Sequence, residues 1–305
     1  MVKPPLLKKG DRVAIVAPAR KVNTVQIQDA LEIIRHHGLE VVLSQHLFSG
    51  FHSYLAGSDH ERLSDLQSCL DDPTVKAIIC ARGGYGSTRI VDELDLTKFA
   101  LKPKWLVGFS DVTAIHLKLI KSEIMSIHGT MPILFSRPDS GDSITSLMTV
   151  LLEGNFSLAA RASNFNRPGM AQGKLVGGNL SLVADSLGTS TEIETENCIL
   201  LLEEIDEYFY RIDRMMTQLK RAGKLKNLKG LAIGHMTEIK ESELPYGECI
   251  EKIILDKVKE YNYPVAFGIP SGHENPNLAW IHGSSTSFSV SAGGVLLSHR
   301  DEIVI

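Results

Sequence analysis

The sequence predicts an α/β protein with a parallel-sheet domain in its N-terminal half and a mixed, β-rich domain in its C-terminal half. Three observations predict this class: apolar strand patterns alternate with helical patterns as far as residue 153, the pattern breaks from 154 to 172, and short strands dominate from residue 265. At 305 residues, the chain is long enough to form two domains with sizeable cores.

The N-terminal half, residues 1–153, is expected to form a flavodoxin-like parallel sheet. Its strands are short apolar runs, and Ile27, Leu31 and Ile34 mark one apolar face of the first helix. The expected strands are 12–17, 40–43, 75–81, 104–108 and 124–128, and the expected helices are 25–37, 59–70 and 111–121. Short strands that alternate with helices are typical of a parallel sheet covered on both faces, in which sites gather at the carboxyl ends of the strands. The corners at Gly83 and Gly108 lie at such ends.

The C-terminal domain is expected to comprise residues 173–305, after a linker at 154–172. The linker is predicted because this segment is rich in small and polar residues and has no sustained hydrophobic period. The expected strands that follow are 173–178, 197–204 and 228–234, the expected helices are 211–221 and 247–261, and short strands begin at 265.

Composition excludes several classes of protein. Hydrophobic residues make up 43% and charged residues 22%, as in an ordinary globular protein. The net charge of −4, with scattered basic residues, argues against nucleic acid or an anionic membrane as partner. No apolar run approaches the ~18 residues of a membrane span, and we expect a cytoplasmic protein. The cysteines are far apart and form no CxxC pair, so neither a disulfide framework nor a zinc site is indicated.

Ser110 is the first candidate catalytic residue. The sequence turns from a strand pattern through Gly108, Phe109 and Ser110 directly into a helical pattern. A serine at such a corner holds its hydroxyl near the N–H groups of the following helix, which favour a developing oxyanion. Hydrolases use this arrangement as a nucleophile elbow, although Val112 stands where G-x-S-x-G has its second glycine. The alternative is that Ser110 only caps the helix.

A nucleophilic serine needs a base, and the base needs an acid to orient it. His273 lies in a turn-rich loop after strand 265–267, although His128 and His235 also close apolar strands. Glu203 and Glu204 end another apolar strand. Because alternation sends them to opposite faces, at most one can meet His273, and the other is expected at a solvated or ion-paired edge.

Glycines cluster in the turn from residue 81 to 88, between a strand and a helix. Gly83 and Gly84 could donate backbone N–H groups to an anion, or the turn could simply be tight. It matches neither the P-loop nor the dinucleotide fingerprint. Asn277 stands where an H-E-x-x-H motif starting at His273 needs its second histidine, which disfavours zinc peptidase chemistry.

Together these segments resemble the LD-carboxypeptidase family, which includes muramoyltetrapeptide carboxypeptidases and microcin-immunity relatives. The motifs that carry the resemblance are spaced along nearly the whole chain: residues 10–18, 81–86, 108–111, 128–129, 177–180, 202–204, 210–214 and 272–273. The resemblance implies Ser110 as nucleophile, His273 as base and Glu203 as orienting acid. It further implies a serine-dependent, metal-free and commonly dimeric enzyme, with no cofactor.

The activity implied is release of a C-terminal D-amino acid, D-Ala, from murein tetrapeptides in peptidoglycan recycling. Hydrolysis of a microcin-type peptide-nucleotide antibiotic is the alternative within the family. The oxyanion hole is expected from the N–H of Asp111 and an N–H of the Gly83–Gly84 turn. Arg82 is expected either to bind the terminal carboxylate of the peptide or to form a structural ion pair.

Two departures from the family pattern bear on substrate choice. Phe209 stands where the family often has a proline, and the run Leu278-Ala279-Trp280-Ile281-His282 replaces a Leu-Pro-Leu-Gly-like sequence.

Two rival functions also stay open at this point. A kinase of the NAD or lipid type is weakened because Tyr85 replaces the aspartate of its glycine turn, and a non-catalytic protein would bind peptide in a hinged cleft without turnover.

Overall fold

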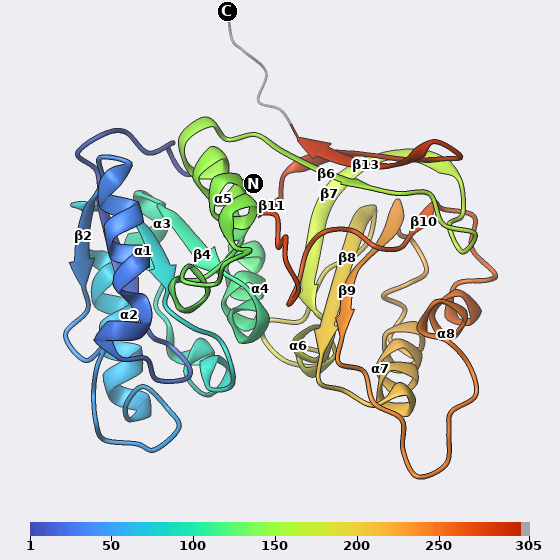
Figure 1. Cartoon of the computed structure of the whole chain (residues 1–305), viewed down its shortest axis with the longest axis horizontal. Helices are drawn as coiled ribbons and strands as arrows, with labels where there is room; N and C mark the ends of the chain where they lie inside the picture. Colours follow the sequence, from blue (N-terminus) through green and yellow to red (C-terminus); the bar gives the residue numbers. More distant parts are fainter. Residues whose placement is uncertain (300–305) are drawn as a thin grey trace, which may run out of the picture. The chain divides into compact units, whose positions relative to one another are not determined.

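The computed structural model describes residues 1–299, and contacts within the chain divide it into two compact units (Figure 1). The N-terminal unit comprises Met1–Gly154 together with Leu278–Gly283. The C-terminal unit comprises Asn155–Asn277 and the described residues from Ser284 to His299. None of the helices in residues 1–299 combines the length and apolar composition that a membrane span requires.

The N-terminal unit is built on a six-stranded sheet in the order β11-β5-β4-β3-β1-β2. Its strands are β1 (Arg12–Val16), β2 (Glu40–Leu43), β3 (Val75–Cys80), β4 (Trp105–Gly108), β5 (Ser126–His128) and β11 (Trp280–His282). The first five pair in parallel, and β11 is antiparallel to β5. The order β2-β1-β3-β4-β5 is the flavodoxin-like arrangement, which confirms the predicted fold of this half.

The helices of this unit include the three that the hydrophobic period predicts. They are α1 (Thr24–His36), α2 (Asp59–Asp71), α3 (Thr97–Leu101), α4 (Thr113–Lys121) and α5 (Gly141–Glu153), with short 3-10 turns η1 (Ser87–Arg89), η2 (Val91–Glu93), η3 (Ser110–Val112) and η4 (Pro132–Leu134). Capping boxes define two helix starts, Asn23 with Gln26 before α1 and Ser58 with Glu61 before α2.

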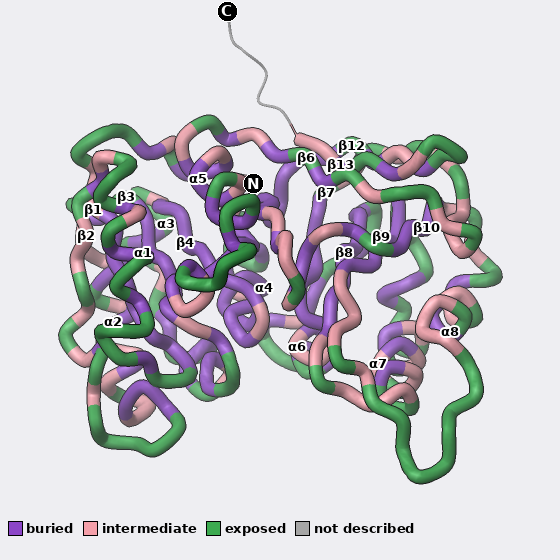
Figure 2. Tube along the Cα trace, in the orientation of Figure 1, coloured by how far each residue is buried: buried purple, intermediate pink, exposed green. Residues whose placement is uncertain are grey.

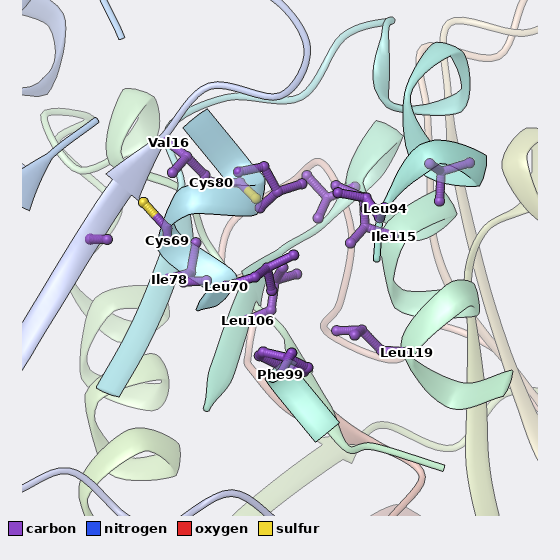
Figure 3. Packing of buried hydrophobic residues seen from close by; sticks show 14 of the residues in the cluster. Val16, Cys69, Leu70, Ile78, Cys80, Leu94, Phe99, Leu106, Ile115 and Leu119 are labelled. Atoms are coloured by element: carbon purple, nitrogen blue, oxygen red, sulfur yellow. The ribbon is translucent and has the colours of Figure 1, made fainter. Parts of the chain in front are cut away.

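One face of the sheet packs against α2, α3 and α4 (Figure 3). Alternate strand residues such as Ile78 and Cys80 contribute from the sheet, and Leu70, Phe99 and Ile115 contribute from the helices. Residues between them in β1, β3 and β4 are also buried. Burial on both faces explains why these strands read as continuous apolar runs and not as alternating ones.

The C-terminal unit is built on a mixed seven-stranded sheet in the order β10-β9-β8-β7-β12-β13-β6. Its strands are β6 (Phe156–Ala160), β7 (Gly169–Asn179), β8 (Cys198–Ile205), β9 (Gly230–Thr237), β10 (Val265–Ala266), β12 (Ser285–Ser291) and β13 (Gly294–His299), and its helices are α6 (Leu180–Asp185), α7 (Phe209–Arg221) and α8 (Ile250–Lys257). Strands β7 to β10 pair in parallel, whereas β12, β13 and β6 pair antiparallel. In Figure 2, β8 is buried along nearly its whole length, and the loop after β9 is exposed.

The expected linker at 154–172 is partly strand. Phe156–Ala160 forms β6 and Gly169 begins β7. The prediction failed because β6 is a short strand rich in small residues, and its partner is β13 at the far end of the chain. Phe156 and Leu158 are buried in this sheet.

The expected C-terminal domain also differs, because Leu278–Gly283 belongs to the N-terminal unit. This segment contains β11, whose residues Trp280, Ile281 and His282 are all buried. The Trp280 ring stacks on His128 with 5.0 Å between centroids, and the His282 ring stacks on His116 at 4.4 Å. The departure from the family pattern at 278–282 therefore forms part of the N-terminal sheet.

Candidate active site

Ser110 lies at a strained corner between β4 and α4. Its φ of +62° is in the left-handed region, which residues other than glycine seldom adopt. Such strain persists only where the surrounding structure imposes it, and it clusters at functional sites. The N-cap of the following 3-10 turn is Phe109, without a side-chain cap, so Ser110 is not the capping residue. The geometry is that of a nucleophile elbow.

Gly108 and Val112 explain why this elbow departs from G-x-S-x-G. A Cβ at Gly108 would lie 2.8 Å from Cγ1 of Val112, closer than real Cβ contacts allow. Val112 is fully buried. The elbow therefore requires a glycine two residues before the serine. The side chain of Val112, two residues after the serine, fills the space beside Gly108.

The Gly83–Gly84 turn passes directly beside Ser110. A Cβ at Gly83 would lie 3.1 Å from Cβ and 3.3 Å from Oγ of Ser110. The carboxylate of Asp111 accepts a hydrogen bond from the Ser87 N–H at 2.8 Å and so links the elbow to this turn. Burial raises the pKa of Asp111, and hydrogen bonds from the turn oppose that effect. The N–H of Asp111 belongs to a first helical turn, where N–H groups have no intrahelical acceptor.

His116 supports the elbow from α4, a role that sequence reasoning missed. Its Nε2 lies 2.9 Å from the Gly108 carbonyl oxygen and its Nδ1 lies 2.8 Å from Oγ of Ser126. Burial lowers the pKa of His116 to about 4, so the ring is neutral near pH 7. A carbonyl can only accept, so Nε2 carries the proton and Nδ1 accepts from the Ser126 hydroxyl. The only signal in the sequence was a histidine among apolar helix residues.

We expect the stability of the protein to fall as the pH falls from about 6.5 to 4, because buried His116 must be protonated on unfolding. Its folded pKa, about 4, is below the ordinary value of 6.5. The contribution of neutral His116 to the free energy of unfolding is therefore fully present above pH 6.5. Acidification to pH 4 removes up to about 3 kcal/mol of it. The check is urea unfolding of the wild type and of His116→Gln across this range. The variant should show a shallower slope, and the exposed-site control His60→Gln should keep the wild-type slope; equal slopes in all three would contradict the prediction.

Glu203 and His273 form a hydrogen-bonded pair in the C-terminal unit. Oε2 of Glu203 lies 2.7 Å from Nδ1 of His273, and Glu203 is fully buried at the end of β8. Gly272 has a φ of +128°, and a Cβ there would lie 3.0 Å from Oε2 of Glu203. Its N–H donates to Oδ1 of Asn277 at 2.9 Å. The loop therefore holds the imidazole against the carboxylate in one orientation.

Glu204 faces away from this pair, as strand alternation predicts. It is buried and not a solvated or ion-paired edge residue, which corrects the expectation for the second carboxylate. Its oxygens accept hydrogen bonds from Nδ2 of Asn179 at 2.8 Å and from Oγ and N–H of Ser181 at 2.6 and 2.8 Å. Burial raises the pKa of Glu204. Its contacts tie β8 to the start of α6.

The other two candidate histidines have different surroundings. Nδ1 of His235 accepts the N–H of Glu274 at 3.2 Å, and burial lowers the pKa of His235. His128 is fully buried beside Trp280. Of the three, His273 is the one that the structure pairs with a carboxylate.

A cavity of about 430 Å³ lies within the C-terminal unit, next to the His273 loop. Its lining includes Phe209, His235, Phe267 and Glu274. The departure at Phe209 therefore faces this cavity. Within residues 1–299, no group of three or more histidine, cysteine or carboxylate side chains is placed to bind a metal ion.

Both halves of the chain match known family models. Residues 13–129 match the LD-carboxypeptidase N-terminal domain, and residues 172–288 match the LD-carboxypeptidase C-terminal domain. The chain belongs to the LD-carboxypeptidase family. It is therefore a hydrolase of the serine peptidase type, as the resemblance implied.

Several LD-carboxypeptidase relatives cover most of the chain. A putative carboxypeptidase of Synechocystis is 37% identical over 94% of both chains. A probable murein peptide carboxypeptidase of Bacillus subtilis is 35% identical over 91% of this chain and 88% of its own.

Solved structures agree with this assignment. The muramoyltetrapeptide carboxypeptidase of Oxalobacter formigenes superposes with a TM-score of 0.87 at 30% identity, over 95% of this chain and 99% of its own. An MccF-like protein of Bacillus anthracis shares the fold, with a TM-score of 0.85 at 23% identity over 99% and 100% of the two chains.

Proposed function

We propose that this LD-carboxypeptidase releases the C-terminal D-Ala from murein tetrapeptides. The observation that carries the proposal is the buried Glu203 carboxylate on Nδ1 of His273, because a carboxylate in this place orients an imidazole for proton transfer. The strained Ser110 elbow supplies a matching nucleophile. The names of the relatives from Bacillus subtilis and Oxalobacter formigenes support the substrate class.

In the proposed mechanism, Oγ of Ser110 attacks the amide carbonyl before the terminal residue. Nε2 of His273 takes the serine proton, gives it to the leaving amine of D-Ala and later activates the water that hydrolyses the acyl-enzyme. Glu203 holds the Nδ1–H tautomer and stabilises the imidazolium. The N–H of Asp111 and an N–H of the Gly83–Gly84 turn would stabilise the oxyanion. Arg82 would bind the terminal carboxylate.

We further propose that the enzyme works as a homodimer in the cytoplasm, in peptidoglycan recycling. The family resemblance supports the dimer. The cysteines among the described residues are all free, which suits a reducing compartment.

We expect strict selection for a D residue at the C-terminus. A site that binds the terminal carboxylate and aims the scissile carbonyl at Ser110 leaves one direction for the last side chain, and a displacement of about 1 Å can cost ~100-fold in rate. The measurement is mass-spectrometric detection of alanine release from tetrapeptides that end in D-Ala or L-Ala. Equal rates would remove the LD-carboxypeptidase specificity while leaving a serine hydrolase. An aminoacyl-nucleotide cleaved in the same assay, with both peptides intact, would favour the antibiotic hydrolase.

A further inference from the structure

Two arginines lie together at the carboxyl edge of the N-terminal sheet. Arg20 follows β1 and Arg82 follows β3. The N–H of Arg20 donates to the Gly83 carbonyl at 3.3 Å, which joins the two segments. Strand order reverses between β1 and β3, and open α/β sheets bind their ligands at this point.

The side chain of Arg20 is exposed but held in place. Its guanidinium carbon lies 4.9 Å from the centre of the Tyr54 ring. A Cβ at Gly84 would lie 3.0 Å from Cβ of Arg20 and 3.2 Å from Oη of Tyr54, so the glycine leaves room for this stack. Stacking uses the flat face of a guanidinium and leaves the N–H donors in its plane for a carboxylate.

Neither guanidinium has a carboxylate partner among residues 1–299. Arg62 and Arg89 both pair with Asp59, but no aspartate or glutamate in this part of the chain forms an ion pair with Arg20 or Arg82. Burial, and after it the charge of Arg20, lowers the pKa of half-buried Arg82. Two neighbouring guanidinium groups that lack carboxylate partners in the described residues suit a ligand that carries two negative groups.

We propose that Arg20 binds a second carboxylate of the substrate, on the side chain of the residue before the terminal D-Ala. This assignment rests on the proposed function, in which Arg82 takes the terminal carboxylate. A Cβ at Gly83 would lie 3.3 Å from Oγ of Ser110, so a peptide whose scissile bond meets Ser110 would have its neighbouring residues near this turn. The enzyme would then prefer peptides with meso-diaminopimelate, which carries that carboxylate, to peptides with L-lysine, which lacks it.

The test compares kcat/KM for three tetrapeptides that end in D-Ala. Their third residues are meso-diaminopimelate, its side-chain carboxamide and L-lysine; the carboxamide has the same shape without the charge. We expect the wild type to prefer the carboxylate form by about tenfold or more, as for loss of one charge-assisted hydrogen bond. In Arg20→Gln this preference should disappear, mainly through KM. Arg82→Gln should lower kcat/KM for all three peptides by similar factors.

Arg35→Gln is the matched control, because Arg35 is an exposed arginine at the end of α1, on the opposite edge of the same sheet. Arg35→Gln should leave kcat/KM for all three peptides unchanged. Equal wild-type rates on the three peptides would overturn the assignment while leaving D-Ala release intact. An Arg20→Gln variant in which kcat/KM falls by the same factor for all three peptides would also overturn the assignment. No D-Ala release from any peptide would overturn the proposed function and this assignment with it.

Discussion

Replacing Ser110 by alanine is expected to lower turnover by about a millionfold, because residues that act as one catalytic unit lose nearly all of its effect singly. The left-handed backbone at Ser110 and the Glu203–His273 pair are the observations behind this expectation. His273→Ala and the double variant should be comparably inactive. D-Ala release measured by mass spectrometry would compare the three.

The matched control is Ser122→Ala. Ser122 lies exposed at the C-terminal end of α4, and its hydroxyl donates a hydrogen bond to the Lys118 carbonyl at 3.2 Å. This variant should keep wild-type turnover. If the double variant of Ser110 and His273 lost the product of the two single effects, the two residues would act independently, and the proposed mechanism would be wrong. Full function in Ser110→Ala would instead support a non-catalytic binding protein.

Glu203→Gln is expected to lower kcat by about 10⁴-fold with little loss of stability. The amide keeps the shape of the carboxylate, but its NH₂ group can donate to Nδ1 of His273. The ring then carries its proton on Nε2, which can no longer accept the proton of Ser110. The neutral amide also fails to stabilise the imidazolium. The measurement pairs kcat with thermal unfolding of the same preparation.

Glu204→Gln provides the contrast for Glu203→Gln. The Glu204 carboxylate accepts hydrogen bonds from Asn179 and Ser181. The NH₂ group of a glutamine there would face these donors, which should cost about 1–3 kcal/mol of stability. Its turnover at a permissive temperature should stay close to that of the wild type. An inactive Glu204→Gln beside an active Glu203→Gln would show that the acid was assigned to the wrong neighbour.

The sequence by itself predicted the five parallel strands of the N-terminal sheet and three of the helices in that unit, but not α3 or α5. Apolar runs and helical periods are local properties. The runs predicted the parallel strands because both faces of the N-terminal sheet are buried, and the helical period predicted α1, α2 and α4. Local pattern also predicted the sharp corner at Ser110. Strand alternation predicted that only one of Glu203 and Glu204 could face His273, although it could not say which.

Only the tertiary structure decided which distant residues meet. Glu203 and His273 are 70 positions apart, and their contact distinguishes His273 from His128 and His235, which local sequence did not exclude. The placement of β11 in the N-terminal sheet and of β6 beside β13 depends on partners far along the chain. The same holds for His116 on the Gly108 carbonyl, which requires α4 to fold back over β4. Periodicity reports which face of an element is buried, but pairing depends on how the partner surfaces fit, and no local pattern contains that information.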